Sequence, residues 1–205
     1  MYQRYIKRIL DLVAAVILFI VFLPFFLVIT IILFFAMKGD PFFFQVRPGK
    51  NAKLFKLIKF KTMNEKKNKT GDLLPDIERL TPIGSFLRKT SLDEIPQILN
   101  VIKGDMSLIG PRPLLPEYLP IYSTLQARRH EVMPGITGWA QVNGRNTLSW
   151  DKKFAYDVWY VDHISFKTDL RILLLTIRKV IKREGINSTE MVTMEKFKAG
   201  TNKTE

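Results

Sequence analysis

Two adjacent carboxylates, Asp93 and Glu94, are the side chains whose type and spacing best suit chemistry in this sequence. They follow Arg88 in the stretch RKTSLDEIPQ, which also carries two hydroxyls. One interpretation is structural, because Ser91 and Glu94 have the spacing of a helix-capping box. The other makes Asp93 a nucleophile and Glu94 a metal ligand, with separate roles because successive helical residues point about 100° apart. The two are compatible, since a helix N-terminus favours an ionised carboxylate and a bound phosphate alike.

The composition limits the possible partners and the residue types that could act in catalysis. The chain has 205 residues, enough for one domain plus an appendage. Its formal net charge of +13 predicts an anionic partner, which could be nucleic acid, a membrane surface or a phosphorylated substrate. There is no cysteine, which excludes disulfides, thiolate catalysis and cysteine-based zinc sites. With only His130 and His163 as imidazoles, we expect no multi-histidine metal site.

Residues 12–37 form an uncharged apolar run. As a straight helix the run would measure about 39 Å, whereas a membrane core is about 30 Å thick. The simplest interpretation is therefore a membrane-spanning helix. A cleaved signal peptide fits less well, because the run is long and no small-x-small cleavage site follows it.

Two features of this run favour a re-entrant helix. Basic residues flank both of its ends, and the positive-inside rule places both flanks on the cytoplasmic side. Pro24 lies at the middle, where proline removes a helical hydrogen bond and kinks the helix. A helix that bends at Pro24 and leaves on the face it entered satisfies both observations. Spanning and re-entrant arrangements both stay open on the sequence alone.

A basic segment follows the apolar run. Pro48 and Gly49 indicate a reversal between two short extended pieces. Residues 54–60 mix apolar residues with lysines in no single period, so strand and helix both stay open there. We interpret the lysines as a solvated basic face that rests on anionic headgroups. Single-stranded nucleic acid is the weaker alternative, because the segment is tethered to a membrane insert.

Two arginines further along suit phosphate binding. Pro111 and Pro113 stiffen the backbone on either side of Arg112, so its guanidinium would lose little entropy on gripping a phosphate. Arg145 closes a predicted glycine-rich loop at 134–146, which lacks the phosphate-loop and dinucleotide spacings. The structural alternatives are a rigid surface turn and a tight connection.

The rest of the chain predicts helices. We expect one at 117–132 and another at 150–162. A third carries an apolar stripe made of Leu170, Leu173, Leu174, Ile177, Val180 and Ile181. This helix either covers the core or lies in the plane of a membrane. The tail beyond Gly185 is polar, and we expect it to be mobile.

Taken together, several motifs make the chain resemble the monotopic phosphoglycosyl transferases, a family of bacterial sugar transferases. The motifs are FQVRPG (44–49), KFKTM (59–63), TPIG (81–84), LRKTSLDEIPQ (87–97), KGDMS (103–107), GPRP (110–113) and the stretch 134–145. The resemblance covers nearly the whole chain up to about residue 185. It is strongest to the small members, one of which initiates bacterial protein N-glycosylation.

The resemblance implies a reaction. Such enzymes move a sugar 1-phosphate from a UDP-sugar to polyprenol (undecaprenyl) phosphate and release UMP, in the first membrane step of glycoconjugate assembly. It implies that Asp93 is the nucleophile and that Glu94, together with Asp93, holds Mg²⁺. Arg88 and Arg112 would offset the charge of the pyrophosphate, and Arg145 would contribute to binding the UDP-sugar. The N-glycosylation enzyme suggests UDP-N,N′-diacetylbacillosamine as the donor.

The resemblance also implies an architecture. We expect an α+β, mostly helical protein on the cytoplasmic face of the bacterial inner membrane, with a small β-hairpin and interfacial amphipathic helices. Residues 1–38 would form the re-entrant helix, 39–185 the catalytic domain and 186–205 the tail. Relatives often have a small polar residue before the proline that matches Pro24, whereas Leu23 stands here.

Two other functions agree with the composition. The first is a non-catalytic membrane scaffold that binds anionic lipid through its basic face, and the second is a membrane-tethered nucleic-acid binder. The second predicts steeply salt-dependent affinity for DNA or RNA, and we expect no nucleic-acid partner. Magnesium-dependent release of UMP from a UDP-sugar separates both from the transferase.

Overall fold

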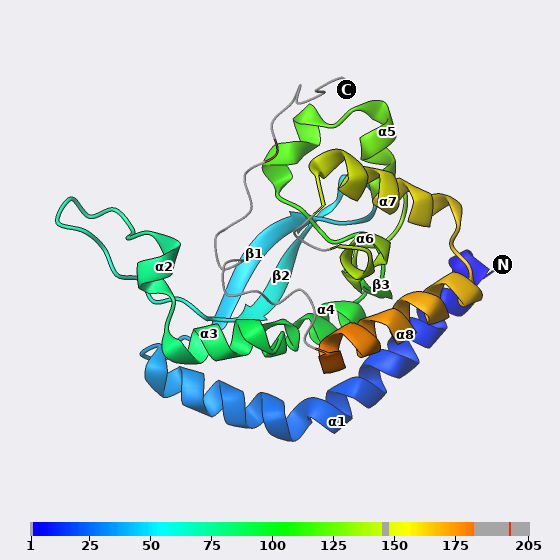
Figure 1. Ribbon diagram of the computed structural model, residues 1–205. Helices are drawn as coiled ribbons and strands as arrows, with labels where there is room; N and C mark the ends of the chain where they lie inside the picture. Colours follow the sequence, from blue (N-terminus) through cyan, green and yellow to red (C-terminus); the bar gives the residue numbers. More distant parts are fainter. Residues whose placement is uncertain (1, 145–147, 183–196, 198–205) are drawn as a thin grey trace.

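The computed structural model describes residues 2–144, 148–182 and 197 (Figure 1). These residues form an α+β fold that is mostly helical, as the sequence predicts. In chain order the elements are η1 (Tyr2–Ile6), α1 (Lys7–Ala36), β1 (Phe42–Pro48), η2 (Lys50–Ala52), β2 (Leu54–Phe60), α2 (Asp76–Arg79), α3 (Pro82–Lys89), η3 (Leu92–Glu94), α4 (Gln97–Lys103), β3 (Ser107–Ile109), η4 (Pro116–Ile121), α5 (Thr124–Ala127), η5 (Arg128–Glu131), β4 (Gly135–Thr137), α6 (Trp139–Val142), α7 (Trp150–Asp162) and α8 (Phe166–Lys182).

Strands β1 and β2 form the predicted hairpin. They pair antiparallel, with Phe42 opposite Phe60 at one end and Pro48 opposite Leu54 at the other. The reversal after Pro48 is confirmed, and residues 54–60 are a strand. Cross-strand pairing and burial of Leu57 and Phe60 decide what the mixed period left open.

The main core lies between this hairpin and the helices α1, α3 and α4. Ala15 and Leu33 of α1 are fully buried in it. Their cluster also contains Ile29, Met37, Leu57, Phe60, Leu87, Ile95, Ile98, Val101 and Met106. Helix α1 is therefore packed along part of its length against the globular part of the protein.

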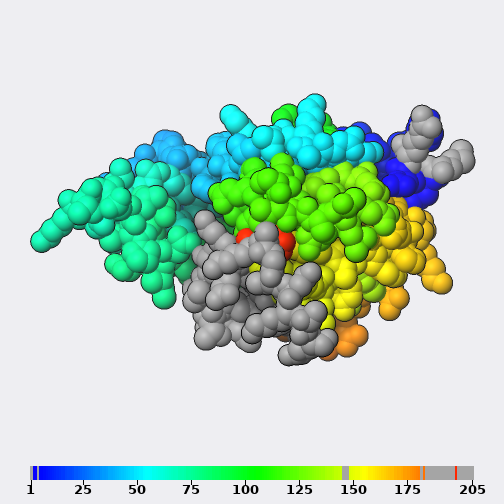
Figure 2. Space-filling model, turned by 90° about the horizontal axis from the view of Figure 1, so that it is seen from above, coloured from blue at the N-terminus to red at the C-terminus, as the bar shows by residue number. Residues whose placement is uncertain are grey.

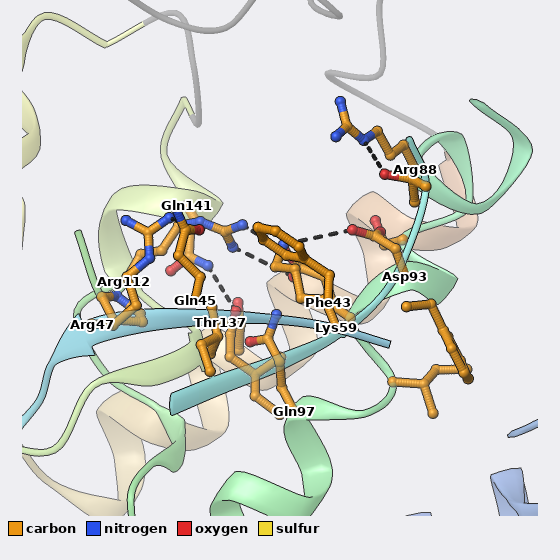
Figure 3. Close-up of a pocket in the computed structure, with 18 of the residues that line it drawn as sticks. Phe43, Gln45, Arg47, Lys59, Arg88, Asp93, Gln97, Arg112, Thr137 and Gln141 are labelled. Atoms are coloured by element: carbon orange, nitrogen blue, oxygen red, sulfur yellow. Dashed lines mark hydrogen bonds and ion pairs between the residues drawn. The ribbon is translucent and has the colours of Figure 1, made fainter. Parts of the chain in front are cut away.

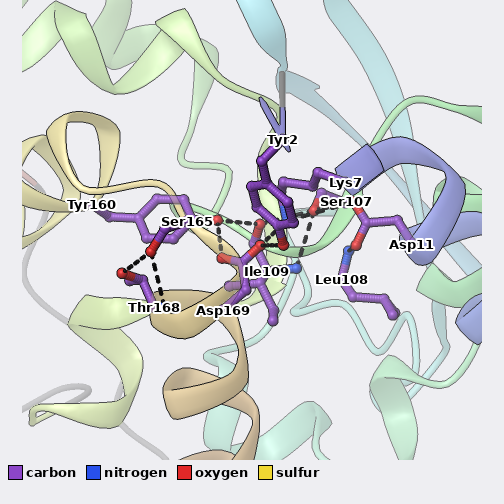
Figure 4. A network of polar contacts seen from close by, with 10 residues as sticks. All are labelled: Tyr2, Lys7, Asp11, Ser107, Leu108, Ile109, Tyr160, Ser165, Thr168 and Asp169. Atoms are coloured by element: carbon purple, nitrogen blue, oxygen red, sulfur yellow. Dashed lines mark hydrogen bonds and ion pairs between the residues drawn. The ribbon is translucent and has the colours of Figure 1, made fainter. Parts of the chain in front are cut away.

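Polar contacts fasten the first turns of α1 to distant elements (Figure 4). The Lys7 ammonium donates to Asp169 of α8 at 2.8 Å, and Tyr160 of α7 donates to the other oxygen of Asp169 at 2.7 Å. Asp11 accepts a 2.7 Å hydrogen bond from the Ser107 hydroxyl of β3. Lys7, Asp11 and Asp169 are all buried, so each charge is paired where solvent cannot stabilise it.

The opposite end of α1 also contacts the globular part. Leu33 and Met37 are buried there, so the two ends of one helix touch the same domain. Figure 1 shows α1 bowing beneath the body of the protein, and Pro24 lies within the helix. The outer face of α1 is exposed and apolar; for example, Phe35 is 77% exposed. By length and composition this helix could cross a membrane.

Helix α3 begins with strong local signals. The Thr81 hydroxyl caps it by accepting from the Gly84 amide at 3.0 Å, and Pro82 occupies the first turn. A Cβ at Gly84 would lie 1.9 Å from the Thr62 carbonyl oxygen, so only glycine permits this approach. The close packing lets Arg88, near the end of the helix, donate to the Thr62 hydroxyl at 3.0 Å.

Two sequence predictions for residues 117–146 are wrong. Residues 117–132 do not form one helix but the short elements η4, α5 and η5. Pro120 interrupts the pattern, and Ser123 and Gln126 make a capping box that starts a new helix. The glycine-rich stretch 134–146 is not a loop throughout, because β4 pairs in parallel with β3 and α6 follows it.

Helix α7 has the predicted bounds. The predicted apolar stripe lies on α8, and the structure decides between its two alternative roles. Ile172 faces the core and is fully buried. The apolar stripe does not cover the core, since Leu170, Leu173, Leu174, Ile177 and Val180 are all at least 41% exposed. The side chain of Ile181 lies outside the described residues. An exposed apolar stripe needs another partner, which the in-plane membrane alternative provides.

Residues 65–75 form an excursion that projects from the body of the protein, visible from above in Figure 2. It contains one isolated bridge, between Lys67 and Leu73, and α2 follows it. Arg145 and the tail at 186–205 fall outside the described residues, except for Phe197. The Phe197 ring packs against Tyr118 and Phe154.

Candidate active site

The carboxylate pair lies on a sharp turn between α3 and α4. Ser91 has φ 58°, in the left-handed region, and its side chain makes no capping hydrogen bond. The predicted capping box is therefore wrong, because a capping serine needs an extended backbone to reach the N3 amide. Non-glycine residues with positive φ are uncommon and cluster at functional sites. Here the turn starts η3 and leaves Asp93 only 8% exposed.

Two cations from distant elements hold Glu94. The Lys59 ammonium of β2 donates to Glu94 Oε1 at 2.7 Å. The Arg112 guanidinium donates to Oε1 at 2.5 Å and to Oε2 at 3.4 Å. Burial raises the pKa of Glu94, but Arg112 and Lys59 together outweigh burial and hold that pKa far below its usual range. Glu94 is therefore an ionised carboxylate at neutral pH.

Asp93 is held more loosely. Its Oδ2 lies 3.5 Å from the Lys59 ammonium, the one ion pair it makes among the described residues. Burial raises the pKa of Asp93, Lys59 opposes that rise and Glu94 reinforces it. Figure 3 shows the Asp93 carboxylate beside Lys59 in the wall of a cavity. A carboxylate with one distant partner keeps lone pairs free for attack, which fits Asp93 better than Glu94 to the role of nucleophile.

The cavity has a volume of about 1250 Å³ and a cationic lining. Its basic residues are Arg47, Lys59, Lys61, Arg79, Arg88, Lys89, Arg112, Arg129, Lys153 and Lys179. Burial and the nearby Arg112 lower the pKa of Arg47 to about 10. Burial also lowers the pKa of Lys153 to about 8. So many cations in one partly buried space repel one another, and a phosphorylated ligand would relieve that repulsion.

The structure brings together Asp93, Glu94, Arg88 and Arg112, all chosen from the sequence. Sequence reasoning missed Arg47 and treated Lys59 as part of a solvated face. Arg47 stands in the motif FQVRPG and Lys59 in KFKTM, so the signal was present in the motifs. The motifs alone could not reveal these roles, because the sequence left strand and helix open at residues 54–60 and did not show which side chains of the hairpin face inward.

A buried ion pair braces the Arg112 loop. Arg129 donates to Asp157 Oδ2 from Nε at 3.1 Å and from Nη2 at 2.7 Å, and both side chains are almost fully buried. The same Nη2 donates to the Arg112 carbonyl oxygen at 2.7 Å. Burial raises the pKa of Asp157 and the Arg129 guanidinium opposes it. Nothing in the spacing of Arg129 and Asp157 pointed to this pair.

The donor set suits a metal shared with a substrate. Among the described residues no group of three histidine or acidic side chains could hold a metal ion. Asp93 and Glu94 remain as neighbouring carboxylates at the cavity. Mg²⁺ is commonly held by one or two carboxylates, with substrate phosphates and water completing the shell. The residues fit such an ion, provided that Lys59 and Arg112 release part of Glu94.

Comparisons with known proteins identify the family of the chain. The model of the family described as "Bacterial sugar transferase" matches residues 2–183. The chain is 56% identical over 193 residues to the "Uncharacterized sugar transferase EpsL" of Bacillus subtilis, covering 94% of this chain and 95% of that protein.

Two longer relatives carry names that specify a reaction. One is the "UDP-galactose-lipid carrier transferase" of Erwinia amylovora, 38% identical over 89% of this chain. The other is the "UDP-glucose:undecaprenyl-phosphate glucose-1-phosphate transferase" of Klebsiella pneumoniae, 39% identical over 84% of this chain. The matches cover 42% and 39% of those two proteins. With the family match and the full-length similarity to EpsL, the chain belongs to the bacterial sugar transferase family.

Proposed function

We propose that this protein transfers a sugar 1-phosphate from a UDP-sugar to undecaprenyl phosphate, releasing UMP, through a covalent aspartyl phosphosugar intermediate. The observation that carries the proposal is the pairing of a loosely held Asp93 with a tightly held Glu94 in a cation-lined cavity. The names of the Erwinia and Klebsiella relatives support the same class of reaction.

The chemistry proceeds in two displacements. The Asp93 carboxylate attacks the phosphorus that bears the sugar, and the bond from that phosphorus to the oxygen of UMP breaks. This step leaves an acyl phosphate on Asp93. An oxygen of undecaprenyl phosphate then attacks the same phosphorus, which frees Asp93 and forms the lipid pyrophosphate sugar. One anhydride replaces another, so the overall reaction needs little driving force.

The surrounding residues stabilise charge. Arg47, Arg88 and Arg112 face the cavity, where they would bind the pyrophosphate and the departing UMP. Glu94 with Asp93 would hold Mg²⁺, which supplies further neutralisation of the pyrophosphate charge. Lys59 bridges the two carboxylates and offsets the repulsion between their negative charges.

The exposed apolar faces of α1 and α8 suit the membrane. The two helices lie along the same side of the protein in Figure 1. A straight helix of this length standing across a membrane would carry one end about 45 Å from the other. Because Lys7 and Met37 both contact the globular part, we infer that α1 is re-entrant. The basic residues that flank both ends of the apolar run support a domain on the cytoplasmic face of the inner membrane.

Topology can be tested by labelling. The chain has no cysteine, so Gln3→Cys and Lys69→Cys each introduce a single thiol at an exposed position. A re-entrant α1 predicts that a membrane-impermeant thiol reagent labels neither variant in intact cells and both after permeabilisation. Labelling of Gln3→Cys alone in intact cells would show that α1 spans the membrane.

Arg112→Lys tests the grip on phosphate. Lysine keeps the charge but cannot reproduce the planar fork that Arg112 presents. We expect kcat/KM for the UDP-sugar to fall by about a hundredfold, the size of effect seen when one preorganised charge-stabilising donor is lost. Arg128→Lys, at a surface position outside the cavity, is the matched control and should keep parental kinetics. An Arg112→Lys protein with parental kcat/KM would remove this residue from the phosphate site.

A donor screen tests the function itself. The panel contains UDP-N,N′-diacetylbacillosamine, suggested by the N-glycosylation enzyme, together with UDP-galactose and UDP-glucose, suggested by the relatives' names. UMP is measured with undecaprenyl phosphate present, with Mg²⁺ and after its chelation. Mg²⁺-dependent release with at least one donor is expected. No release with any donor would favour the non-catalytic lipid-binding scaffold.

A further inference from the structure

A buried amide at the cavity has an unused donor. Gln97 is the first residue of α4, four positions after Asp93, and is 2% exposed. Its Nε2 is buried and has no hydrogen-bond partner. Figure 3 shows this side chain pointing into the cavity that contains Asp93. Buried polar atoms are nearly always paired in folded proteins, so an unpaired one needs an explanation such as a ligand or an unseen water.

A second amide offers the complementary acceptor. Gln141 Nε2 donates to the Ile136 carbonyl oxygen at 2.8 Å. This hydrogen bond assigns the nitrogen and the oxygen of the amide. Its Oε1 is then left buried and without a partner. Gln141 comes from α6 and also lines the cavity, so its acceptor and the donor of Gln97 belong to the same space.

Thr137 of β4 adds another acceptor. Its hydroxyl lies 2.8 Å from the hydroxyl of Thr176. Thr176 donates its own proton to the Ile172 carbonyl oxygen at 2.8 Å. Thr137 must therefore donate to Thr176, and the remaining lone pairs of Thr137 can accept from a ligand. Three elements thus place one donor and two acceptors, all uncharged, on the wall of one cavity.

This combination does not suit a phosphate. A phosphate at neutral pH accepts hydrogen bonds, so the oxygens of Gln141 and Thr137 would repel it. A sugar hydroxyl both donates and accepts and matches a wall of mixed polarity. The arginines in the same cavity already suit the pyrophosphate. We infer that Gln97, Thr137 and Gln141 form the subsite that binds the hydroxyl or amide groups of the transferred sugar.

This inference rests on the proposed function, and binding measurements can separate the two. The measurements use the Asp93→Asn protein, which cannot consume the donor. Gln97→Met and Gln141→Met are added singly, since methionine has nearly the length of glutamine but no donor or acceptor. Titration calorimetry with UDP-glucose, UDP-galactose and UMP gives the affinity of each variant for each ligand.

We expect each methionine variant to bind the preferred UDP-sugar about tenfold more weakly, because a buried hydrogen bond to the sugar is lost. The affinity for UMP, which carries no sugar, should change by less than about twofold. Gln126→Met, outside the cavity, is the matched control and should bind both ligands as the parent does. Thermal unfolding confirms that each variant is folded.

Other results would overturn the subsite. Unchanged UDP-sugar affinity in both methionine variants would mean that ordered water satisfies these amides. Equal weakening toward UMP and UDP-sugar would place them at the nucleotide instead. If the Asp93→Asn protein binds UMP but binds no UDP-sugar more tightly than UMP, Gln97, Thr137 and Gln141 do not bind the sugar and the subsite fails, whereas the proposed transferase function survives. If the Asp93→Asn protein binds neither UMP nor a UDP-sugar, the proposed function fails and the subsite fails with it.

Discussion

Asp93→Asn is expected to lower turnover by a factor on the order of 10⁶, as the loss of a covalent nucleophile does in a serine protease. The variant should stay folded. Asparagine has nearly the same shape, and the Lys59 ammonium keeps its 2.7 Å ion pair with Glu94 when the 3.5 Å contact with Asp93 is lost. Activity and thermal unfolding should therefore respond very differently to this one substitution.

A single-turnover experiment identifies the nucleophile. Parental protein given UDP-sugar and Mg²⁺, without undecaprenyl phosphate, should release about one UMP per active site and then stall. Intact-mass analysis should detect a sugar-phosphate adduct, and peptide mapping should place it on Asp93. Asp93→Asn should give neither the burst nor the adduct.

Direct attack by the lipid phosphate on the UDP-sugar is the competing mechanism. It predicts no UMP before the lipid is added and no adduct at any time. That result would end the covalent proposal while leaving the transferase assignment intact. Burst and adduct in the Asp93→Asn protein would instead move the nucleophile to another residue.

Asp157→Ala should lower the free energy of unfolding by about 3–5 kcal/mol, because it leaves the buried Arg129 guanidinium without its counter-ion. Denaturant unfolding measures that loss. The same substitution should lower kcat/KM, since Arg129 holds the Arg112 carbonyl at 2.7 Å and so positions the Arg112 loop.

The neighbouring ion pair between Arg128 and Asp162 provides the control. Its side chains are 36% and 44% exposed, so water and salt already screen the charges. Asp162→Ala should leave both the unfolding midpoint and kcat/KM close to parental values. A similar small effect in Asp157→Ala would show that the Arg129–Asp157 pair neither stabilises the fold nor braces the site.

Features that depend on neighbours along the chain could be predicted from the sequence. The period of apolar residues gave α7 its bounds, and Pro48 with Gly49 indicated the hairpin reversal. Two adjacent carboxylates and an arginine between two prolines are likewise local patterns. The type of chemistry and the residues Asp93, Glu94 and Arg112 could therefore be selected before any contact was known.

Local patterns also misled where the backbone departed from the expected conformation. Ser91 and Glu94 have the spacing of a capping box, but the left-handed Ser91 prevents the bond. Pro120 and the cap at Ser123 divide what an apolar period predicted as one helix. The spacing of apolar and polar residues reports neither the φ angle of a single residue nor a new cap inside an apolar period.

Partners distant in sequence were decided by the tertiary structure alone. Lys59 reaches Glu94 across 35 positions of sequence, and Arg129 reaches Asp157 across 28. Such pairs depend on how β2, η3, η5 and α7 pack, which no local period encodes. The amino-acid sequence thus determined which chemical groups this protein carries and the helices that hold several of them. Packing decided which cation neutralises which carboxylate, because Coulomb attraction in a buried site depends on distance in space rather than along the chain.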